Sequence, residues 1–119
     1  MLKKTIKYTN YNGEEQIEDF YFNLSKAELT EMELSTTGGY GEMLQGIVAA
    51  EDHTKLVPII KDIIFKSYGE KSADGKRFMK SPELSTAFSQ TEAYSELFME
   101  IATDADASAA FVNGIIPTD

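Results

Sequence analysis

The side chains that most often perform acid–base or nucleophilic chemistry are scarce in this chain. The sequence has a single histidine, His53, and no cysteine. A thiolate nucleophile, a disulfide and a cysteine-based zinc site are therefore excluded. General-base catalysis by His53 would need a positioned partner, which the sequence does not reveal. We interpret His53 as a surface residue at a helix boundary and predict that the protein is not an enzyme.

Two short motifs partly resemble ligand-binding loops. Asp104 and Asp106 offer carboxylates to a hard cation, but a calcium loop needs more oxygen ligands and a glycine at its sharp turn. The glycine-rich residues 37–41 lack the Lys-Ser/Thr ending of a phosphate loop and follow a helical pattern. We predict no metal and no cofactor, and we expect Asp104 to cap a helix.

The last third of the chain, residues 81–119, has the most distinctive composition. It holds seven acidic residues and no Lys or Arg, within a chain of 20 acidic and 11 basic residues and net charge −9. Such a charge repels nucleic acid and anionic membrane surfaces, so we predict neither as a partner. The segment is also rich in aromatic and aliphatic residues, which a disordered acidic tail would lack. This combination indicates a surface that a basic and apolar partner covers.

Glu92, Glu96 and Glu100 lie at successive i, i+4 positions in this segment. Like charges at that spacing destabilise an isolated helix by roughly 0.2–0.5 kcal/mol per pair. Two interpretations are open. The three acids either form a docking face for a basic partner, or they form a solvated face or one paired with the basic residues of segment 70–80.

Apolar residues supply the other half of the predicted binding surface. An apolar stripe runs along the helical pattern, and the terminal segment 111–117 continues past the last predicted helix. That terminal segment either folds back onto the core or stays free to bind. The partner-binding residues that we predict from these patterns are Tyr94, Phe98, Ile101, Phe111, Val112, Ile115 and Ile116, with Glu92, Glu96 and Glu100 tuning the interaction.

Local signals indicate the elements that position these residues. Asn12-Gly13 favours a two-residue type I′ hairpin turn, which would place Tyr8 opposite Ile17 and leave aromatic residues on both faces of the ribbon. Ser25 and Glu28 form a capping box that begins a helix. Further helices are predicted over 42–51, over 54–68 with Gly69 as its end, over 81–103 with a break near 89–91 where Ser89 caps the second part, and from Asp104 onward.

These elements predict one α+β, mainly α domain over residues 1–119. It comprises an N-terminal β-hairpin (1–23), a helical core (24–69), a basic loop (70–80) and an acidic amphipathic helical segment (81–119), with about five helices in a small bundle.

Nearly the whole chain resembles the tail assembly chaperones of long-tailed, siphophage-type bacteriophages. The stretches that carry the resemblance are Phe22–Leu29, Lys76–Leu84, Thr91–Phe98, Ala105–Ala107 and Phe111–Pro117. The resemblance implies a non-enzymatic protein that binds the tape measure protein in the host cytoplasm, keeps it soluble and promotes tail tube polymerisation around it. It also implies absence from the mature virion, and in this family a longer frameshifted product is common.

Physical considerations agree with such a role. A tape measure helix exposes apolar stripes until the tube covers them, so a chaperone needs apolar patches to shield them and charge to keep the complex soluble. Other functions stay open at this stage. The chain could be a structural tail or connector component whose hairpin makes intersubunit contacts, or an acidic mimic of nucleic acid. The tail tube protein as a second partner and a homo-oligomer are also open.

Overall fold

The computed structural model describes residues 1–35, 39, 42, 45–46 and 57–117. Within these residues the elements are β1 (Leu2–Thr9), β2 (Glu15–Phe22), α1 (Lys26–Ser35), α3 (Val57–Ser67), β3 (Tyr68–Lys71), β4 (Phe78–Met79), α4 (Pro82–Ser89), α5 (Glu92–Thr103) and α6 (Ala105–Ile115). The predicted α+β, mainly α class with an N-terminal hairpin is confirmed. The helix predicted over 42–51 lies largely outside the described residues. No helix in the described part of the chain is long and apolar enough to cross a membrane.

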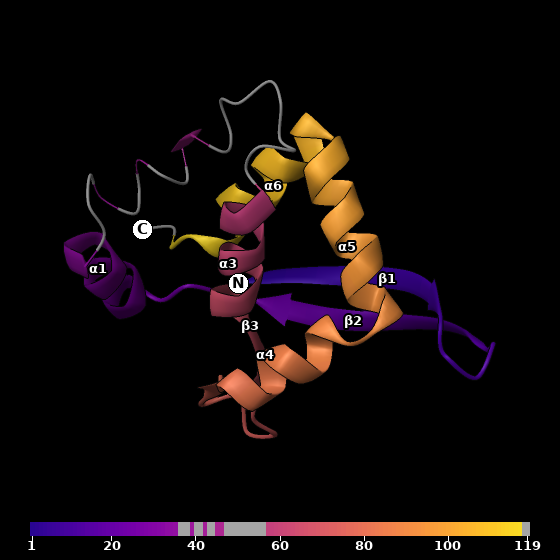
Figure 1. The fold of residues 1–119 in the computed structure, drawn as a ribbon. Helices are drawn as coiled ribbons and strands as arrows, with labels where there is room; N and C mark the ends of the chain where they lie inside the picture. Colours follow the sequence, from indigo (N-terminus) through magenta and orange to yellow (C-terminus); the bar gives the residue numbers. More distant parts are fainter. Residues whose placement is uncertain (36–38, 40–41, 43–44, 47–56, 118–119) are drawn as a thin grey trace.

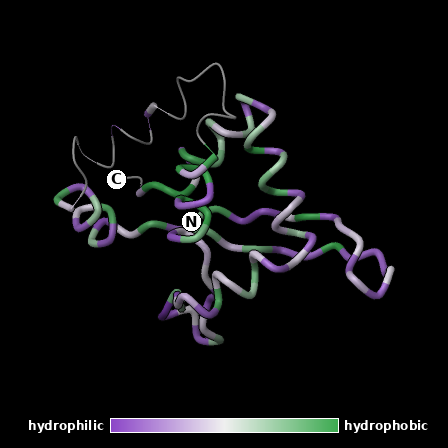
Figure 2. The backbone as a smooth tube through the Cα atoms, viewed as in Figure 1, coloured by the Kyte–Doolittle hydropathy of each residue, from purple (hydrophilic) through white to green (hydrophobic). Residues whose placement is uncertain are grey.

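The strands form one antiparallel sheet in the order β1-β2-β3-β4. β1 and β2 make a long ribbon, whereas β3 joins β2 through only two residue pairs. Helices α3 and α6 lie at the inner end of the ribbon, α5 lies across the ribbon, and the turn projects beyond α5 (Figure 1). That projecting end is hydrophilic (Figure 2), as expected for a turn that no helix covers.

The turn of this hairpin differs from the one predicted. Residues 11–13 form a three-residue loop, in which the N–H of Gly13 donates to the carbonyl of Asn10 at 3.0 Å and Gly13 has φ of +78°. Asn12 does not have the positive φ that a type I′ turn requires. The side chain of Asn10 explains why the three-residue loop forms instead, because its Oδ1 accepts hydrogen bonds from the N–H groups of Asn12 and Glu14.

The longer loop shifts the strand register by one residue, so Tyr8 lies opposite Gln16 instead of Ile17. Because side chains alternate between faces, this shift changes which residues share a face. Ile6 and Phe22 now point together into the core, while Ile17 on the other face is 68% exposed. The face of the ribbon that carries Ile17 is therefore not buried at this position in the described part of the chain.

Residues 68–79 contain a second hairpin where the sequence indicated a helix end and a basic loop. Gly69 lies in β3 opposite Tyr21, and its φ is not positive, so it is not a helix cap. A Cβ at position 69 would lie 2.7 Å from the carbonyl oxygen of Met79 and 2.7 Å from the ring of Phe78. This close approach is the reason that a glycine is required here.

The core lies between the inner face of the sheet and the helices. Its centre is aromatic: the ring of Phe88 stacks on Tyr68 at 4.4 Å between centroids, and Phe22 meets Phe111 edge-on at 5.2 Å. The apolar face of α3 completes it with Ile60, Ile63 and Ile64, all fully buried.

The helix starts are set by local caps. Ser25 and Glu28 make the reciprocal capping-box hydrogen bonds that were predicted. Asp104 caps α6 as predicted, accepting from the N–H groups of residues 106 and 107. The chain does break before α5, but Thr91 is its N-cap residue, whereas Ser89 was predicted.

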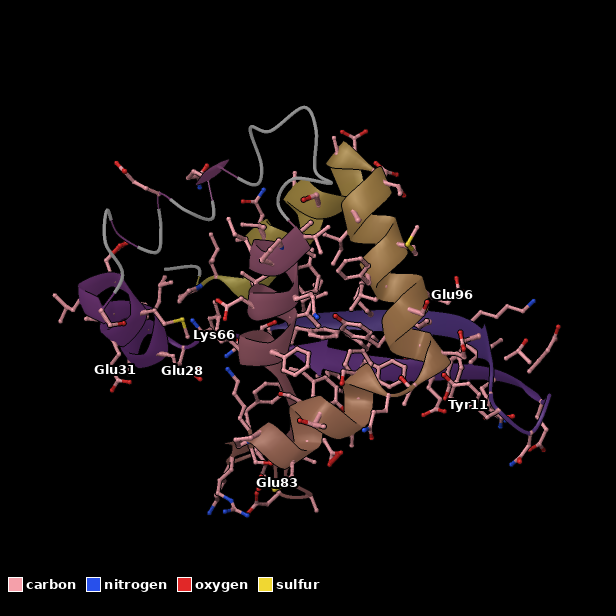
Figure 3. All side chains as sticks on the ribbon, viewed as in Figure 1. Tyr11, Glu28, Glu31, Lys66, Glu83 and Glu96 are labelled. Carbon is pink, nitrogen blue, oxygen red and sulfur yellow. The ribbon has the colours of Figure 1, made fainter. Side chains whose placement is uncertain are left out.

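Helix α1 has no buried residue of its own and is tied to the body of the protein by Lys80. The ammonium of Lys80 lies 2.7 Å from the carboxylate of Glu28 and also donates to the carbonyls of Asn23 and Lys66. Figure 3 labels Glu28 and Lys66 on α1 and α3, the two helices that this side chain bridges. The basic residue nearest α4 is thus structural and is not part of a free loop.

Candidate partner-binding surface

Helix α5 carries most of the predicted partner-binding residues, and its two faces are clearly separated. Ala93, Leu97 and Ile101 are buried toward the sheet. Glu96 is exposed on the opposite side together with Met99, which is 53% exposed, whereas Glu100 lies at the border and reaches β1. Of the three acids at i, i+4 spacing, Glu96 therefore lies opposite the buried apolar face, while Glu92 is half-buried and Glu100 is directed to Lys4 of β1.

Two of these three acids are engaged by the N-terminal hairpin. Glu100 Oε1 lies 2.7 Å from Lys4 Nζ of β1. In the hairpin turn, the carboxylate of Glu92 raises the pKa of the exposed Tyr11 hydroxyl. No ion pair is present at Glu96 within the described residues, and its side chain is exposed on α5 (Figure 3).

The alternative in which the acids pair with the basic segment 70–80 is not found among the ion pairs that the structure describes. Lys71 instead lies over the ring of Tyr21, 4.6 Å from its centroid, and Lys80 pairs with Glu28. At one end of the acidic face of α5, Glu100 pairs with β1, and at the other end Glu92 interacts with the hairpin turn. Its middle, at Glu96, is left to solvent or to a partner.

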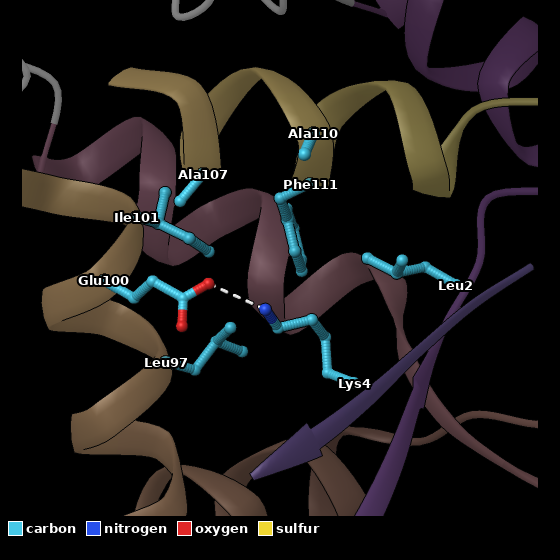
Figure 4. Close-up of a pocket in the computed structure, with 8 residues that line it drawn as sticks. All are labelled: Leu2, Lys4, Leu97, Glu100, Ile101, Ala107, Ala110 and Phe111. Carbon is cyan, nitrogen blue, oxygen red and sulfur yellow. Dashed lines mark hydrogen bonds and ion pairs between the residues drawn. The ribbon is translucent and has the colours of Figure 1, made fainter. Parts of the chain in front are cut away.

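Beside this acidic face lies an apolar hollow of about 140 Å³, between β1, α5 and α6 (Figure 4). The residues that line it are Leu2, Lys4, Leu97, Glu100, Ile101, Ala107, Ala110 and Phe111. The Lys4–Glu100 ion pair spans one side of it (Figure 4). The small side chains of the two alanines keep the hollow open, since larger side chains at those positions would fill it.

Leu2 is held at the hollow by a close approach of α6. A Cβ at Gly114 would lie 2.9 Å from a methyl carbon of Leu2, so the glycine gives the side chain of Leu2 room to pack close to the helix. The hollow therefore depends on both ends of the chain.

The terminal segment folds back onto the core, which answers the alternative left open by the sequence. Phe111, Val112 and Ile115 are between 0 and 3% exposed, and Ile101 on α5 is fully buried. The carbonyl of Ile115 accepts a hydrogen bond from Leu24 N–H at 2.8 Å, which anchors the end of α6. A direct contact of Val112 or Ile115 with a partner would require α6 to leave the core.

The remaining predicted contact residues are only partly covered. Tyr94 and Phe98 pack side by side, with 5.9 Å between ring centroids, at the flank of α5 away from the hollow. The hydroxyl of Tyr94 has no hydrogen-bond partner among the described residues, and burial raises its pKa. Ile116 is half-buried after the end of α6.

Sequence patterns brought Ile101, Phe111 and Glu100 into the predicted site, and the structure does place these three around one hollow. The sequence patterns did not identify Leu2 and Lys4, because only the packing of β1 against α5 brings the first residues of the chain to the hollow. The alanines at 107 and 110, one helical turn apart, were a signal that could have been used.

A comparison with protein families identifies the family to which the chain is similar. The model of a family described as phage tail assembly chaperone matches residues 1–119, which is the entire chain. No curated protein and no solved structure shows significant similarity to the chain.

Proposed function

We propose that this chain, which belongs to the phage tail assembly chaperone family, binds the tape measure protein during tail assembly, keeps it soluble and promotes polymerisation of the tail tube protein around it. The observation that carries the proposal is the family match over the whole length of the chain. In this role the protein acts without a chemical step. It works in the host cytoplasm and leaves before the virion is complete.

The hollow beside α5 suits an apolar side chain of a tape measure helix. Its volume of about 140 Å³ is close to the roughly 150 Å³ of an apolar cavity that can hold a benzene-sized group. An amphipathic helix presents such side chains at i, i+3, i+4 and i+7, so one anchor in the hollow would align its neighbours along α5.

The acidic face of α5 selects the partner by charge. Glu96 is exposed, and Glu92 and Glu100 flank it at one-turn spacing. Basic residues beside the apolar stripe of the bound helix would meet these carboxylates, which speeds association and fixes orientation more than it adds affinity.

The same surface permits release. The Lys4–Glu100 pair is partly exposed, with side chains 27% and 46% accessible, so it adds little to stability and can open and reclose at small cost. Met99 next to it is a flexible side chain that adapts to different apolar partners. Both features fit a chaperone that the tail tube later displaces from the tape measure protein.

Co-expression tests this proposal. The tape measure protein from the same genome is produced with and without this chain, and its solubility and retention on the tagged chain are measured. We expect soluble, retained tape measure protein only when the chain is present. A tape measure protein that stays equally insoluble and unretained would overturn the proposal.

A structural role in the virion is the second candidate, and the specific observation in its favour is the exposed edge of β1. Mass spectrometry of purified particles separates the two. A chaperone is absent or far below stoichiometric amounts in the particles, whereas a tail or connector component is present in a fixed ratio to the tube protein.

A further inference from the structure

A second hollow lies between β2 and β3, and we call it the β2–β3 hollow. β3 pairs with β2 only at Tyr21 and Phe22, so the two strands diverge toward the start of β2. The space that this opens is about 320 Å³, within the roughly 300–1,000 Å³ of clefts that hold a ligand. The residues that line it are Glu18, Asp19, Phe20, Tyr21, Tyr68, Gly69, Glu70 and Lys71, none of which lines the hollow beside α5.

The floor of the β2–β3 hollow is aromatic. Tyr68 lies opposite Phe22 across the two strands, and side chains two residues apart on a strand share a face, so Phe20 and Tyr68 lie on the same inner face. Both rings pack on Phe88 of α4, with 5.1 Å between the centroids of Phe20 and Phe88 and 4.4 Å between those of Tyr68 and Phe88. These contacts hold the two rings in place as a preformed apolar surface.

The rim of the hollow on the same face is acidic. Glu18 and Glu70 each lie two residues from one of these rings, so the inner face carries both carboxylates. Both residues are exposed, and neither makes an ion pair within the described residues. Glu18 accepts a hydrogen bond from the hydroxyl of Tyr8, which fixes the position of its charge. Lys71 also lines the hollow, but its ammonium lies over the ring of Tyr21 on the opposite face, 4.6 Å from the centroid. The inner face of the hollow is therefore negatively charged.

A buried hydroxyl group faces this hollow without a hydrogen-bond partner among the described residues. Tyr68 is only 8% exposed, it lines the hollow, and its hydroxyl makes no hydrogen bond in the described part of the chain. Burial, followed by the carboxylates of Glu70 and Glu18, raises the pKa of Tyr68, so both acids act on this group. The hydroxyl oxygen can accept a hydrogen bond, and a cationic donor placed there would also meet the two carboxylates. Three groups therefore converge on one position that favours a cation.

We propose that the β2–β3 hollow binds an arginine side chain from a segment of a partner protein. A guanidinium is planar, stacks on aromatic rings and presents several donors in a fixed fork, so it can use the ring surface, both carboxylates and the hydroxyl together. An ammonium is a strongly hydrated point charge that matches fewer of these groups. Residues 15–20 of β2 have no strand on this side in the described part of the chain, which leaves room for the backbone that carries the arginine. The contact adds to the proposed binding at the hollow beside α5 and does not depend on it.

Peptide titration followed by nuclear magnetic resonance tests this site in the full-length chain. The probe is acetyl-Gly-Thr-Arg-Thr-Gly-amide, and the backbone amide signals of Phe20 and Gly69 report on the hollow. Two peptides of the same length are compared with it, one with lysine in place of arginine and one with citrulline, which has the shape of arginine without its charge. We expect the arginine peptide to bind about tenfold more tightly than the citrulline peptide, with the lysine peptide between them.

Conservative variants remove one group of the hollow each and keep the fold. Glu70→Gln removes a carboxylate charge from an exposed strand position, and Tyr68→Phe removes the hydroxyl but keeps the ring on Phe88. We expect Glu70→Gln to weaken binding of the arginine peptide about tenfold and Tyr68→Phe to weaken it by a smaller factor. Glu15→Gln is the matched control, because Glu15 is exposed on β2 outside the hollow and loses the same charge, and it should bind like wild type.

Several results would overturn the proposal. An arginine peptide that causes no saturable shift, or that binds no better than the citrulline peptide, would show that the hollow does not recognise the charge, and so would a folded Glu70→Gln that binds like wild type. Free arginine that binds more tightly than the peptide would indicate a small-molecule site. Signals that move with protein concentration in wild type but not in Arg77→Gln would show that the single arginine of this chain fills the hollow of another copy. Retention of the tape measure protein is measured separately, so either proposal can fail alone.

Discussion

Lys80 reaches Glu28 across 52 residues of sequence, with 2.7 Å between the ammonium nitrogen and the carboxylate. The same ammonium donates to two backbone carbonyls, at Asn23 and Lys66. One side chain thus satisfies groups on three segments and holds α1, which buries no residue of its own, against the body of the protein.

Replacing Lys80 should therefore weaken the fold. Lys80→Met removes the donor from Glu28 and from both carbonyls, and leaving partly buried groups unsatisfied costs about 1–3 kcal/mol. The free energy of unfolding from urea titration measures the loss. Lys76→Met is the matched control, because Lys76 is exposed in the β3–β4 turn, and we expect its stability to stay near that of wild type.

The same contact predicts a dependence on pH. Burial alone would raise the pKa of Glu28, but hydrogen bonds from Lys80 and Ser25 outweigh burial and lower it below the ordinary value of 4.5. A lowered folded-state pKa stabilises the fold above pH 4.5, and that contribution is lost as pH falls through the folded-state pKa. Stability of wild type and of Glu28→Gln, measured from pH 7 down to 3, should converge at the acidic end. Parallel curves would contradict this.

Gly69→Ala should be destabilising although the backbone there is ordinary β-strand. The added methyl would meet a backbone oxygen and an aromatic ring at 2.7 Å, and such overpacking typically costs about 1–3 kcal/mol. Thermal unfolding measures it. Gly114→Ala is the comparison: its new methyl meets the mobile end of Leu2, so we expect a smaller loss than at Gly69.

Filling the hollow should block tape measure binding without unfolding the protein. Ala107→Leu places a larger side chain in the space of about 140 Å³ and is expected to weaken retention of the tape measure protein at least tenfold. Ala105→Leu, on the same helix but not lining the hollow, should bind like wild type. Equal binding by both folded variants would exclude the hollow as the contact.

Reversing the charge of Glu96 should slow association with the tape measure protein. Glu96→Lys removes the middle acid of the exposed face, and changes of this kind act mainly on the association rate and on its salt dependence. Surface plasmon resonance at two salt concentrations separates the rates. Glu83→Lys on α4 changes the same charge on another helix (Figure 3), and its association rate should stay closer to that of wild type.

What the sequence predicted well is governed by contacts within a few residues. The capping box at Ser25 and the cap at Asp104 need only neighbouring groups, so their patterns predicted the helix starts correctly. The break before α5 was also located, although Thr91 and not Ser89 supplies the capping oxygen.

What the sequence did not predict depends on distant partners or on one competing side chain. β3 is a strand because Gly69 fits against β4 and pairs with Tyr21, and a short polar stretch gives no sign of this. The hairpin register followed the side chain of Asn10, which a rule based on Asn-Gly alone does not include. The hollow needed Leu2 and Lys4, nearly a hundred residues from the helix they meet.

The composition of the sequence suggests removing the acidic segment after Lys80 to test partner binding. The fold shows that this truncation would not be informative. A chain that ends there lacks Leu97, Ile101, Phe111 and Ile115, all of them buried in the core. It would fail to fold and could not report on partner binding, so point variants on a folded chain are the better probes.

The packing of α6 against the first strand also sets when the protein can fold during translation. The N–H of Leu24 donates to the carbonyl of Ile115 at the end of α6, and Lys4 pairs with Glu100 of α5, so the N-terminal hairpin cannot complete its core until residues 92–115 have left the ribosome. Synthesis at about 5–20 residues per second is slow compared with hairpin formation, so β1 and β2 wait unsupported for the helix that covers them. Nascent chains released early by a stalled ribosome would therefore expose the face of the ribbon that α5 and α6 cover, and exposed apolar surface of this kind favours aggregation.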